Sequence, residues 1–490
     1  MIPPGERDAM RTVDTLVDSV PRPYSVVRRY ALLLLFCLAQ FLDSFNNSAL
    51  YTAIPSIGME LDMAENETTW LVSAFQLTFA SFLLISGRIS DIYNPKYAFI
   101  FGITALGGIS IGAGFVREKI TLIVLRALSG IAAALTIPSS LTLLVNLFPE
   151  GREQAHAIGA FGGCSAIGNV LGLVIGALFV EFTTWPWVFW FVAIIALPIA
   201  GICLFLIPPD VKADEDERPL WARWRSLDMI GVSILTAALI LFIFALTSGS
   251  TSGWATARVL APLVISVFMV AGFFYYETCI PADVAAVPPR TWFLPNFAVL
   301  FGVALMPYFW WTTIYTLYTT LWQDVFHWSV ISTALRMLPL GILAMLISLT
   351  GGLARKISPK YILILGQILA AIGTVLLPFA NGPDKYFRFV LPGFILGTIG
   401  SMLTYTHTNI AIFRTSPSSM AGTVGAIFNG ALQLGSAIGI AAMSSIETSL
   451  DAAKGDFTSY RGRAAAFWFV FGVVCLQVIF LSVFYRIEKE

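Results

Sequence analysis

Residues 95–102 read PKYAFIFG, and the same pattern recurs as PKYILILG at residues 359–366. Each copy opens an apolar run long enough to cross a lipid bilayer. A second match follows in the same order: three glycines within residues 163–172 recur with the same spacing within residues 430–439, at nearly the same offset along the chain. Two matches in the same order at nearly one offset indicate an internal duplication.

The rest of the chain is built from apolar runs of the same kind. Of the 490 residues, 57% are hydrophobic and 12% are charged, whereas a soluble domain carries about 25% charged residues. We count fourteen runs of roughly 20 residues, which begin near residues 30, 70, 97, 119, 155, 185, 227, 256, 293, 329, 359, 386, 420 and 465. The composition therefore predicts an all-α integral membrane protein with fourteen transmembrane helices.

The offset between the copies covers eight runs, an even number, so both copies have the same orientation and are related by an axis along the membrane normal. Two six-helix halves account for twelve runs, and the remaining two fit as an inserted central pair after the charged loop PPDVKADEDERPLWARWRSLD. The expected order is a cytoplasmic tail (1–29), an N-terminal six-helix bundle (30–207), a cytoplasmic loop (208–226), two inserted helices (227–278), a C-terminal six-helix bundle (279–486) and a cytoplasmic tail (487–490).

The distribution of basic residues sets the expected orientation. With a cytoplasmic N-terminus, 19 of the 29 Lys and Arg residues fall on the cytoplasmic side, 8 outside and 2 within spans, as the positive-inside rule requires. Both termini are then cytoplasmic, and the polar first 29 residues show no signal-peptide cleavage site. Asn66 begins a glycosylation sequon in the first outer loop, which is short.

Several classes of function find no support in the composition. The five cysteines lie in or at the ends of apolar runs without metal-ligand spacing, so neither disulfides nor a metal site is indicated. Net charge is zero and no basic stretch is interleaved with aromatic residues, so a nucleic-acid partner is not expected. The expected partners are a small molecule, protons and the lipid bilayer.

The loop between the second and third runs reads GRISDIYNPKY. It resembles the G-x-L-x-D-x-x-G-R-K signature of the major facilitator superfamily through Gly87, Asp91 and Lys96, while Asn94 and Pro95 replace the family's glycine and arginine. Gly87 permits close helix approach, and Asp91 can cap a neighbouring helix or pair with a cation. The resemblance implies the major facilitator fold, with this loop helping to hold one conformer.

The fourth run contains LRALSGIAAALTIP, which resembles the family's R-x-x-x-G signature through Arg126 and Gly130. An arginine at mid-helix costs at least ~2.5 kcal/mol, so we expect Arg126 to face a cavity or a partner. The alternative is an arginine that snorkels to the headgroups.

The fifth run, GNVLGLVIGALF, is similar to the G-x-x-x-G-P-x-x-G-G signature of proton-coupled exporters. Leu173 replaces the proline of that signature and Ala177 its last glycine. Small residues every four positions also favour tight helix packing without any export function. The matching residues are Gly168, Gly172 and Gly176.

The first run contains FLDSFNNSALYTAIP, in which Asp43, Asn46, Asn47 and Leu50 share one helix face. Such a polar face would be expensive toward lipid and useful toward an aqueous cavity. The stretch resembles the first span of the fourteen-spanner drug:proton antiporter branch, most closely its fungal members. Further resemblance lies in residues 70–91, 185–191 and 225–231.

That resemblance implies a role for the buried acid. We expect Asp43 to carry the coupled proton, with Arg126 as its electrostatic partner. The alternative is a structural polar contact between the first and fourth helices.

The first run of the second half contains MPYFWWTTIYTLY, whose aromatic face could stack on a flat or cationic substrate. Aromatic residues also gather at membrane interfaces. His407 could titrate near neutral pH or simply pack between helices, and Arg336 leaves the same alternatives open. The expected cavity lining is Asn46, Asn47, Gln76, Tyr308, Trp311, Thr312, Tyr315 and His407.

The sequence thus predicts a monomeric transporter that exports small organic molecules in exchange for protons by alternating access, with no cofactor besides the proton gradient. The plasma membrane is the expected location, and the vacuolar membrane is the alternative. A facilitator for ammonium or borate remains an alternative, which the missing proline after Gly172 favours. A membrane sensor or integral-membrane enzyme is less well supported, because we find no signalling domain, nucleophile elbow or paired carboxylates.

Overall fold

The computed structural model describes residues 25–63, 65–148, 151–208, 228–281, 285, 287–417, 420–454 and 460–486. Within these ranges the chain is helical, without a strand. Thirteen of the helices are long and apolar enough to cross a membrane. They are α3 (Glu65–Ile92), α4 (Pro95–Phe115), α5 (Lys119–Leu147), α6 (Gly151–Phe182), α7 (Pro186–Leu206), α9 (Met229–Ser252), α10 (Ala257–Cys279), α11 (Phe297–Thr320), α12 (Val330–Ser348), α13 (Pro359–Leu376), α14 (Leu391–Arg414), α15 (Ala421–Lys454) and α16 (Arg461–Phe484).

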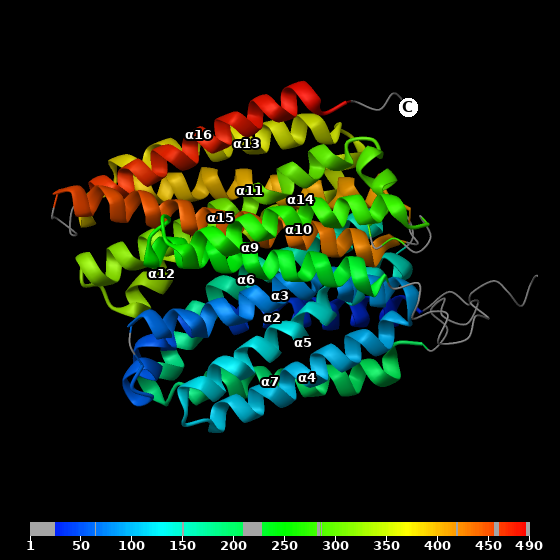
Figure 1. Ribbon diagram of the computed structural model, residues 1–490, viewed down its shortest axis with the longest axis horizontal. Helices are drawn as coiled ribbons and strands as arrows, with labels where there is room; N and C mark the ends of the chain where they lie inside the picture. The colour runs from blue at the N-terminus through cyan, green and yellow to red at the C-terminus, as the bar shows by residue number, and fades with distance from the viewer. Residues whose placement is uncertain are drawn as a thin grey trace, which may run out of the picture.

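The fourteenth spanning helix is α2 (Val26–Glu60), which carries the polar face around Asp43 and lies among the others (Figure 1). Short helical turns extend several helices or link them. They are η1 (Pro289–Phe293), η2 (Leu321–Val325), η3 (Leu349–Arg355), η4 (Leu377–Phe379), η5 (Pro383–Lys385) and η6 (Tyr386–Val390). The predicted fold class, with fourteen transmembrane helices, is confirmed.

The repeated PKY sequence marks the start of a helix in both halves. Pro95 stands in the first turn of α4, where Asn94 caps the helix by accepting a hydrogen bond from the Lys96 amide, 3.0 Å away. Pro359 has the same place in α13. Proline suits this position because the first-turn amides have no partner within the helix.

The two halves repeat one packing scheme. In the first half α2 packs on α6, α3 on α5, and α4 on both α5 and α7; in the second half α11 packs on α15, α12 on α14, and α13 on both α14 and α16. The inserted helices α9 and α10 pack on each other, and α9 also contacts α3 and α15, one helix from each half. The residue boundaries of the predicted domains stay predictions, since both tails and most of the 208–226 loop lie outside the described residues.

Both ends of the described chain lie at one end of the bundle, at the right of Figure 1. Contacts tie the helix ends together there. Arg28 at the start of α2 donates to the Leu206 carbonyl at the end of α7, 2.8 Å, and Lys360 of α13 donates to the Tyr485 carbonyl after α16, 2.8 Å. We call this end the terminal side and the opposite end the far side.

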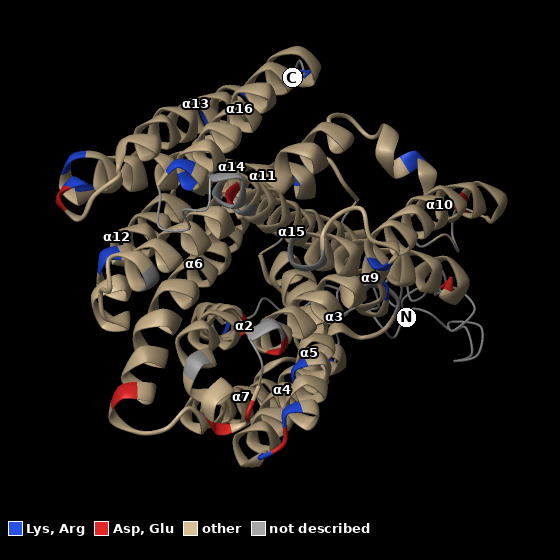
Figure 2. Cartoon of the chain, turned by 60° about the vertical axis from the view of Figure 1, so that its left-hand side comes forward, with Lys and Arg blue, Asp and Glu red and all other residues tan. Residues whose placement is uncertain are grey.

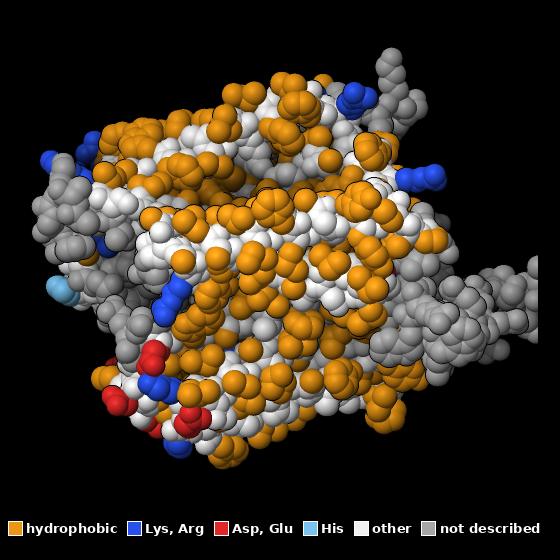
Figure 3. Space-filling view, in the orientation of Figure 1, with side chains coloured by type: hydrophobic (Ala, Val, Ile, Leu, Met, Phe, Trp, Pro, Cys, Tyr) orange, Lys and Arg blue, Asp and Glu red, His pale blue; other side chains and the backbone are white. Residues whose placement is uncertain are grey.

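The outer surface matches a bilayer environment. Hydrophobic side chains cover the flank of the helices in Figure 3. Many large apolar residues, such as Phe101, Phe205 and Leu476, are exposed. The charged residues lie mainly near the helix ends in Figure 2. This is the distribution expected of a multi-pass membrane protein.

Candidate functional site

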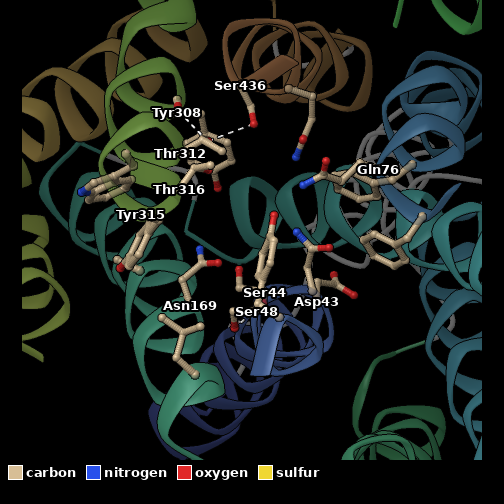
Figure 4. A pocket seen from close by; sticks show the side chains of 18 of the residues that line it. Asp43, Ser44, Ser48, Gln76, Asn169, Tyr308, Thr312, Tyr315, Thr316 and Ser436 are labelled. Atoms are coloured by element: carbon tan, nitrogen blue, oxygen red, sulfur yellow. Dashed lines mark hydrogen bonds between the residues drawn. The ribbon is translucent and has the colours of Figure 1, made fainter. Parts of the chain in front are cut away.

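A cavity of about 290 Å³ lies between the two halves. Its walls come from α2, α3, α5 and α6 of the first half and from α11, α12 and α15 of the second. The polar and aromatic side chains that line it, many of them drawn in Figure 4, are Gln40, Asp43, Ser44, Asn47, Ser48, Tyr51, Phe75, Gln76, Phe79, Asn169, Tyr308, Trp311, Thr312, Tyr315, Thr316, Thr319, Thr320, Asn429, Gln433 and Ser436.

The cavity is closed toward the terminal side by contacts between small residues of the two halves. A Cβ atom added at Gly87 of α3 would stand 2.5 Å from the Gly422 carbonyl of α15, and one added at Gly351 would stand 2.6 Å from the Ala155 carbonyl of α6. Toward the far side, by contrast, Thr319 and Thr320 near the end of α11 still line the cavity. The cavity therefore extends from mid-membrane toward the far side.

The two main walls differ in chemistry. On α2, Gln40, Asp43 and Asn47 follow one helix face and present a carboxylate and two amides. On α11, across the cavity in Figure 4, Tyr308 and Tyr315 present aromatic rings. Among the described lining residues, Asp43 is the only one with a charged side chain.

Asp43 is buried but only half satisfied. The Thr136 hydroxyl of α5 donates to its Oδ2 atom at 2.6 Å. Its Oδ1 atom has no hydrogen-bond partner among the described residues. Because a buried carboxylate oxygen without a partner is unfavourable, this oxygen is available to a proton or to a donor group in the cavity.

Arg126 makes its hydrogen bonds with residues other than Asp43 in this conformer, and its role as the electrostatic partner of Asp43 stays a prediction. It is fully buried, so it does not snorkel to the headgroups. Its Nε atom donates to the Leu71 carbonyl at 2.8 Å, its Nη1 atom donates to Asn46 Oδ1 at 2.9 Å, and its guanidinium lies 4.6 Å from the centre of the Phe75 ring. The side-chain partner that accepts a hydrogen bond from Arg126 is the amide of Asn46.

The structure brings most of the predicted cavity residues together. Asn47 and Gln76 from the first half and Tyr308, Trp311, Thr312 and Tyr315 from the second half all line the cavity with Asp43. Asn46 does not line it, because its side chain turns toward Arg126. The helix periodicity therefore predicted correctly that Asp43 and Asn47 line the cavity, but wrongly that Asn46 does.

His407 and Arg336 lie elsewhere. His407 is fully buried on α14, where its Nε2 atom is 3.4 Å from the Thr350 hydroxyl of η3. The guanidinium of Arg336 on α12 lies 3.9 Å from the centre of the Trp328 ring. Neither side chain reaches the cavity, so the helix-packing alternative describes their positions.

Of the loop-signature residues, Gly87 helps to close the terminal side. Gly87 touches α15 as described above, and Lys96 is buried with its Nζ atom donating to the Ile207 carbonyl at 2.6 Å. The side chains of Asp91 and Asn66 lie outside the described part of the structure. Their roles as conformational latch and glycosylation acceptor stay predictions.

The glycine face of α6 packs against α2. A Cβ added at Gly168 or Gly176 would stand 2.5 Å from the backbone carbonyl of Phe41 or Ala49, and one added at Gly172 would collide with Ser48. The Ser48 hydroxyl also donates to the Gly168 carbonyl at 3.2 Å. These contacts fix the rotation of α2 and so aim Asp43 at the cavity.

Sequence reasoning missed several cavity residues. Asn429, Gln433 and Ser436 follow one face of α15 at helical spacing, a signal that could have been read from the sequence. Asn169 and Ser44 carry no comparable pattern.

Comparisons with known proteins agree with this architecture. The family model described as Major Facilitator Superfamily matches residues 36–440. The puromycin resistance protein pur8 of Streptomyces alboniger is 29% identical, with 87% of this chain and 83% of that protein aligned. The multidrug transporter mfsC of Aspergillus fumigatus is 27% identical, with 94% and 87% aligned.

Among solved structures, the human organic anion transporter MFSD10 superposes with a TM-score of 0.62 at 14% identity, covering 92% of this chain and 99% of that one. This likeness shows a shared fold. With the match to the family model over most of its length, the chain belongs to the Major Facilitator Superfamily.

Proposed function

We propose that this protein is a secondary transporter that exports small organic molecules by alternating access, in exchange for protons. Its family and fold point to a transporter rather than an enzyme. The names of its relatives support export in particular, since they include the puromycin resistance protein, the cephamycin export protein CmcT of Amycolatopsis lactamdurans and the efflux pump terJ of Aspergillus terreus.

The cavity suits a small organic molecule. It combines aromatic rings with amides and hydroxyls around one carboxylate, the mixture typical of small-molecule sites. Its closure on the terminal side and its extension toward the far side describe one of the two states that alternating access requires.

The observation that carries the proposal is the position of Asp43. Its Oδ1 atom is unpartnered, and the residue lines the cavity as the charged member of the described lining. A proton and a donor group of the substrate therefore compete for this one oxygen. Binding of the proton then excludes binding of the substrate, and the reverse, as exchange requires. A membrane potential of 100 mV supplies about 2.3 kcal/mol per transferred charge, enough to drive accumulation.

Arg126 acts through Asn46 in this proposal. The hydrogen bond between them joins α5 to α2 at 2.9 Å, one turn from Asp43. Arg126 thereby positions the wall that carries the acid.

We place the protein in the plasma membrane as a monomer, with the terminal side toward the cytoplasm. The excess of Lys and Arg in the terminal-side loops supports this orientation. The vacuolar membrane would give the same topology.

The test is gradient-driven flux in vesicles with an imposed pH difference, using purified wild type and Asp43→Asn at matched expression, with puromycin among the compounds screened. The amide keeps the size of the side chain but cannot carry the proton, so pH-driven accumulation should disappear while downhill exchange remains. Tyr315→Phe, which alters the opposite wall, should change apparent affinity and keep the response to the gradient. Full pH-driven transport by Asp43→Asn would refute proton coupling at this residue.

A facilitator for ammonium or borate is the second candidate. The proline of the exporter signature is absent after Gly172, where Leu173 stands in its place, and this absence favours the second candidate. The same vesicles decide it: rapid downhill entry of ammonium or borate, with no organic compound moved by the gradient, would establish the facilitator and exclude the exporter.

A further inference from the structure

Two tyrosines form the floor of the cavity on its terminal side. The rings of Tyr308 on α11 and Tyr405 on α14 are nearly parallel, with an interplanar angle of 6° and centroids 6.3 Å apart. Tyr308 lines the cavity, whereas Tyr405 is only 3% exposed and does not. The stacked pair therefore separates the cavity from the part of α14 that continues beyond Tyr405 toward the terminal side.

Hydrogen bonds hold this floor across the joint between the halves. The Tyr308 hydroxyl shares a hydrogen bond with Ser165 of α6 at 3.2 Å, and Ser165 shares another with Ser44 of α2 at 2.6 Å. α11 belongs to the second half, and α2 and α6 belong to the first. Any motion that separates the halves at this level must break the bond between Ser165 and Tyr308.

Tyr405 crosses the same joint by packing. A Cβ added at Gly162 of α6 would collide with the Tyr405 ring. The ring also meets Phe428 of α15, with centroids 5.5 Å apart. Tyr405 thus packs against α6 of the first half and α15 of the second half, and it stacks on the ring of Tyr308.

Buried polar groups follow Tyr405 toward the terminal side. We call Thr406 and Asn409 the polar strip. Each is at most 1% exposed, and the side-chain oxygens of both have no partner among the described residues. With roughly 100° of rotation per residue, Thr406 and Asn409 flank Tyr405 on the side that faces α6, and the Thr406 methyl group stands 3.7 Å from a Cβ added at Gly159.

The equivalent helix of the first half has no such strip. At the offset of the repeated glycines, Ser139 and Thr142 of α5 correspond to Thr406 and Asn409. Both donate to backbone carbonyls of their own helix, at 2.7 Å and 3.0 Å. Unsatisfied buried polar groups are unfavourable, so the strip costs stability in this conformer. Contact with water in another conformer would satisfy it.

We propose that Tyr308 and Tyr405 are a gate held shut by Ser165, and that opening this gate makes the polar strip a wall of the cavity on the terminal side. The proposal rests on the alternating access of the proposed function, but it concerns a motion that can be measured without any substrate.

Single cysteines in a cysteine-free parent provide the test. The probe is a membrane-impermeant maleimide added to vesicles from the terminal side. Asn409→Cys should react measurably, and Thr406→Cys serves as a second reporter if the first variant folds poorly. Thr404→Cys is the matched control: Thr404 is equally buried on the same helix, but it faces α13, where it accepts a hydrogen bond from Gln367 at 3.3 Å. The residues to be replaced in the parent are Cys37, Cys164, Cys203, Cys279 and Cys475.

The gate itself is tested by removing its hydrogen bond. Ser165→Ala and Tyr308→Phe should each raise the labelling rate at residue 409 by roughly threefold to tenfold, because one neutral hydrogen bond shifts a two-state equilibrium by about that factor. The double variant should add little. Ser140→Ala is the control, since its hydroxyl donates only within its own helix, to Ile137 at 2.8 Å.

The outcomes separate this proposal from the proposed function. Labelling at residues 406 and 409 no faster than at residue 404 in every background would overturn the gate, whatever the flux assays show. Equal rates for Ser165→Ala and Ser140→Ala would overturn the role of Ser165. Increased labelling without pH-driven flux would support the gate while removing proton-coupled export.

Discussion

The first helices of the two halves, α2 and α11, have equivalent positions in the fold. Their cavity faces differ, because that of α2 is mainly polar and acidic and that of α11 is mainly aromatic. Phe41 corresponds to Leu305 at the offset of the PKY repeat. The carbonyl of each meets a glycine of the next packed helix, Gly168 on α6 and Gly435 on α15. The backbone contact is therefore the same in both halves.

The cavity faces of these helices differ instead. Gln40 and Asp43 of α2 correspond, at the same offset, to Ala304 and Pro307 of α11. Asn47 corresponds to Trp311, and both of these line the cavity. The two halves therefore share their helix packing and differ in their cavity side chains, so that the carboxylate lies on one wall and most of the aromatic surface on the other.

Crowding the backbone contact that the two halves share should have the largest effect on stability. A Cβ at Gly435 would collide with the Leu305 carbonyl, which cannot rotate away, so Gly435→Ala should lower the free energy of unfolding by about 3 kcal/mol. Gly168→Ala should have a similar, slightly smaller effect, since its Cβ would stand 2.5 Å from the Phe41 carbonyl.

Thermal unfolding of the purified protein in detergent measures both losses. Gly430→Ala is the matched control on α15, because nothing lies within 4 Å of an added Cβ there. If Gly435→Ala were as stable as this control, the common packing of the two halves would be wrong.

A second prediction concerns the anchoring hydrogen bonds of α2 and α11. Asn46 of α2 corresponds to Trp310 of α11; Asn46 accepts from Arg126 at 2.9 Å, and Trp310 donates to Thr374 at 2.8 Å. Arg126→Ala leaves a buried amide and a carbonyl unpaired and should cost about 3 kcal/mol, whereas Thr374→Val removes one neutral hydrogen bond and should cost about 1 kcal/mol. Equal losses in a thermal-unfolding assay would show that the charged anchor is no stronger than the neutral one.

The smallest predicted effect concerns a helix end at the far side. Glu118 caps α5 by accepting from the Thr121 amide at 3.0 Å, whereas the equivalent helix α14 is preceded by the turns η5 and η6. Hydrogen bonds from Thr121 lower the pKa of the Glu118 carboxyl below its ordinary value of 4.5.

A carboxyl with a lowered pKa stabilises the fold above its unfolded pKa and loses that contribution as the pH falls through the folded one. Glu118→Gln should therefore be slightly less stable than wild type at neutral pH and indistinguishable from it in acid well below pH 4.5. Unfolding curves at several pH values measure this, and a difference that persisted in acid would assign the effect to packing.

Sequence periodicity predicted best those features that depend on a single helix. The repeat located the starts of α4 and α13, and the polar face of α2 and the aromatic face of α11 both line the cavity. These features depend on residues within a single helix and on its period, which a sequence displays directly.

The features that failed depend on several helices at once. Asn46 is adjacent to Asn47 in sequence, yet a rotation of roughly 100° per residue turns it to Arg126 rather than to the cavity. Whether Arg126 meets Asp43 or Asn46 depends on the spacing and rotation of α5 relative to α2, which the packing of the whole bundle sets. The same reason hid Asn169 of α6, which lines the cavity without any periodic signal.

The inserted pair has a mechanical consequence. Thr236 of α9 donates to the Ser81 carbonyl of α3 at 3.1 Å, and Trp254, just after α9, donates to Ser445 of α15 at 2.7 Å. Helix α9 is therefore hydrogen-bonded to both halves, to α3 through Thr236 and, nearer the far side, to α15 through Trp254. A motion that separates α3 from α15 must break one of these two hydrogen bonds, so the inserted pair opposes that motion.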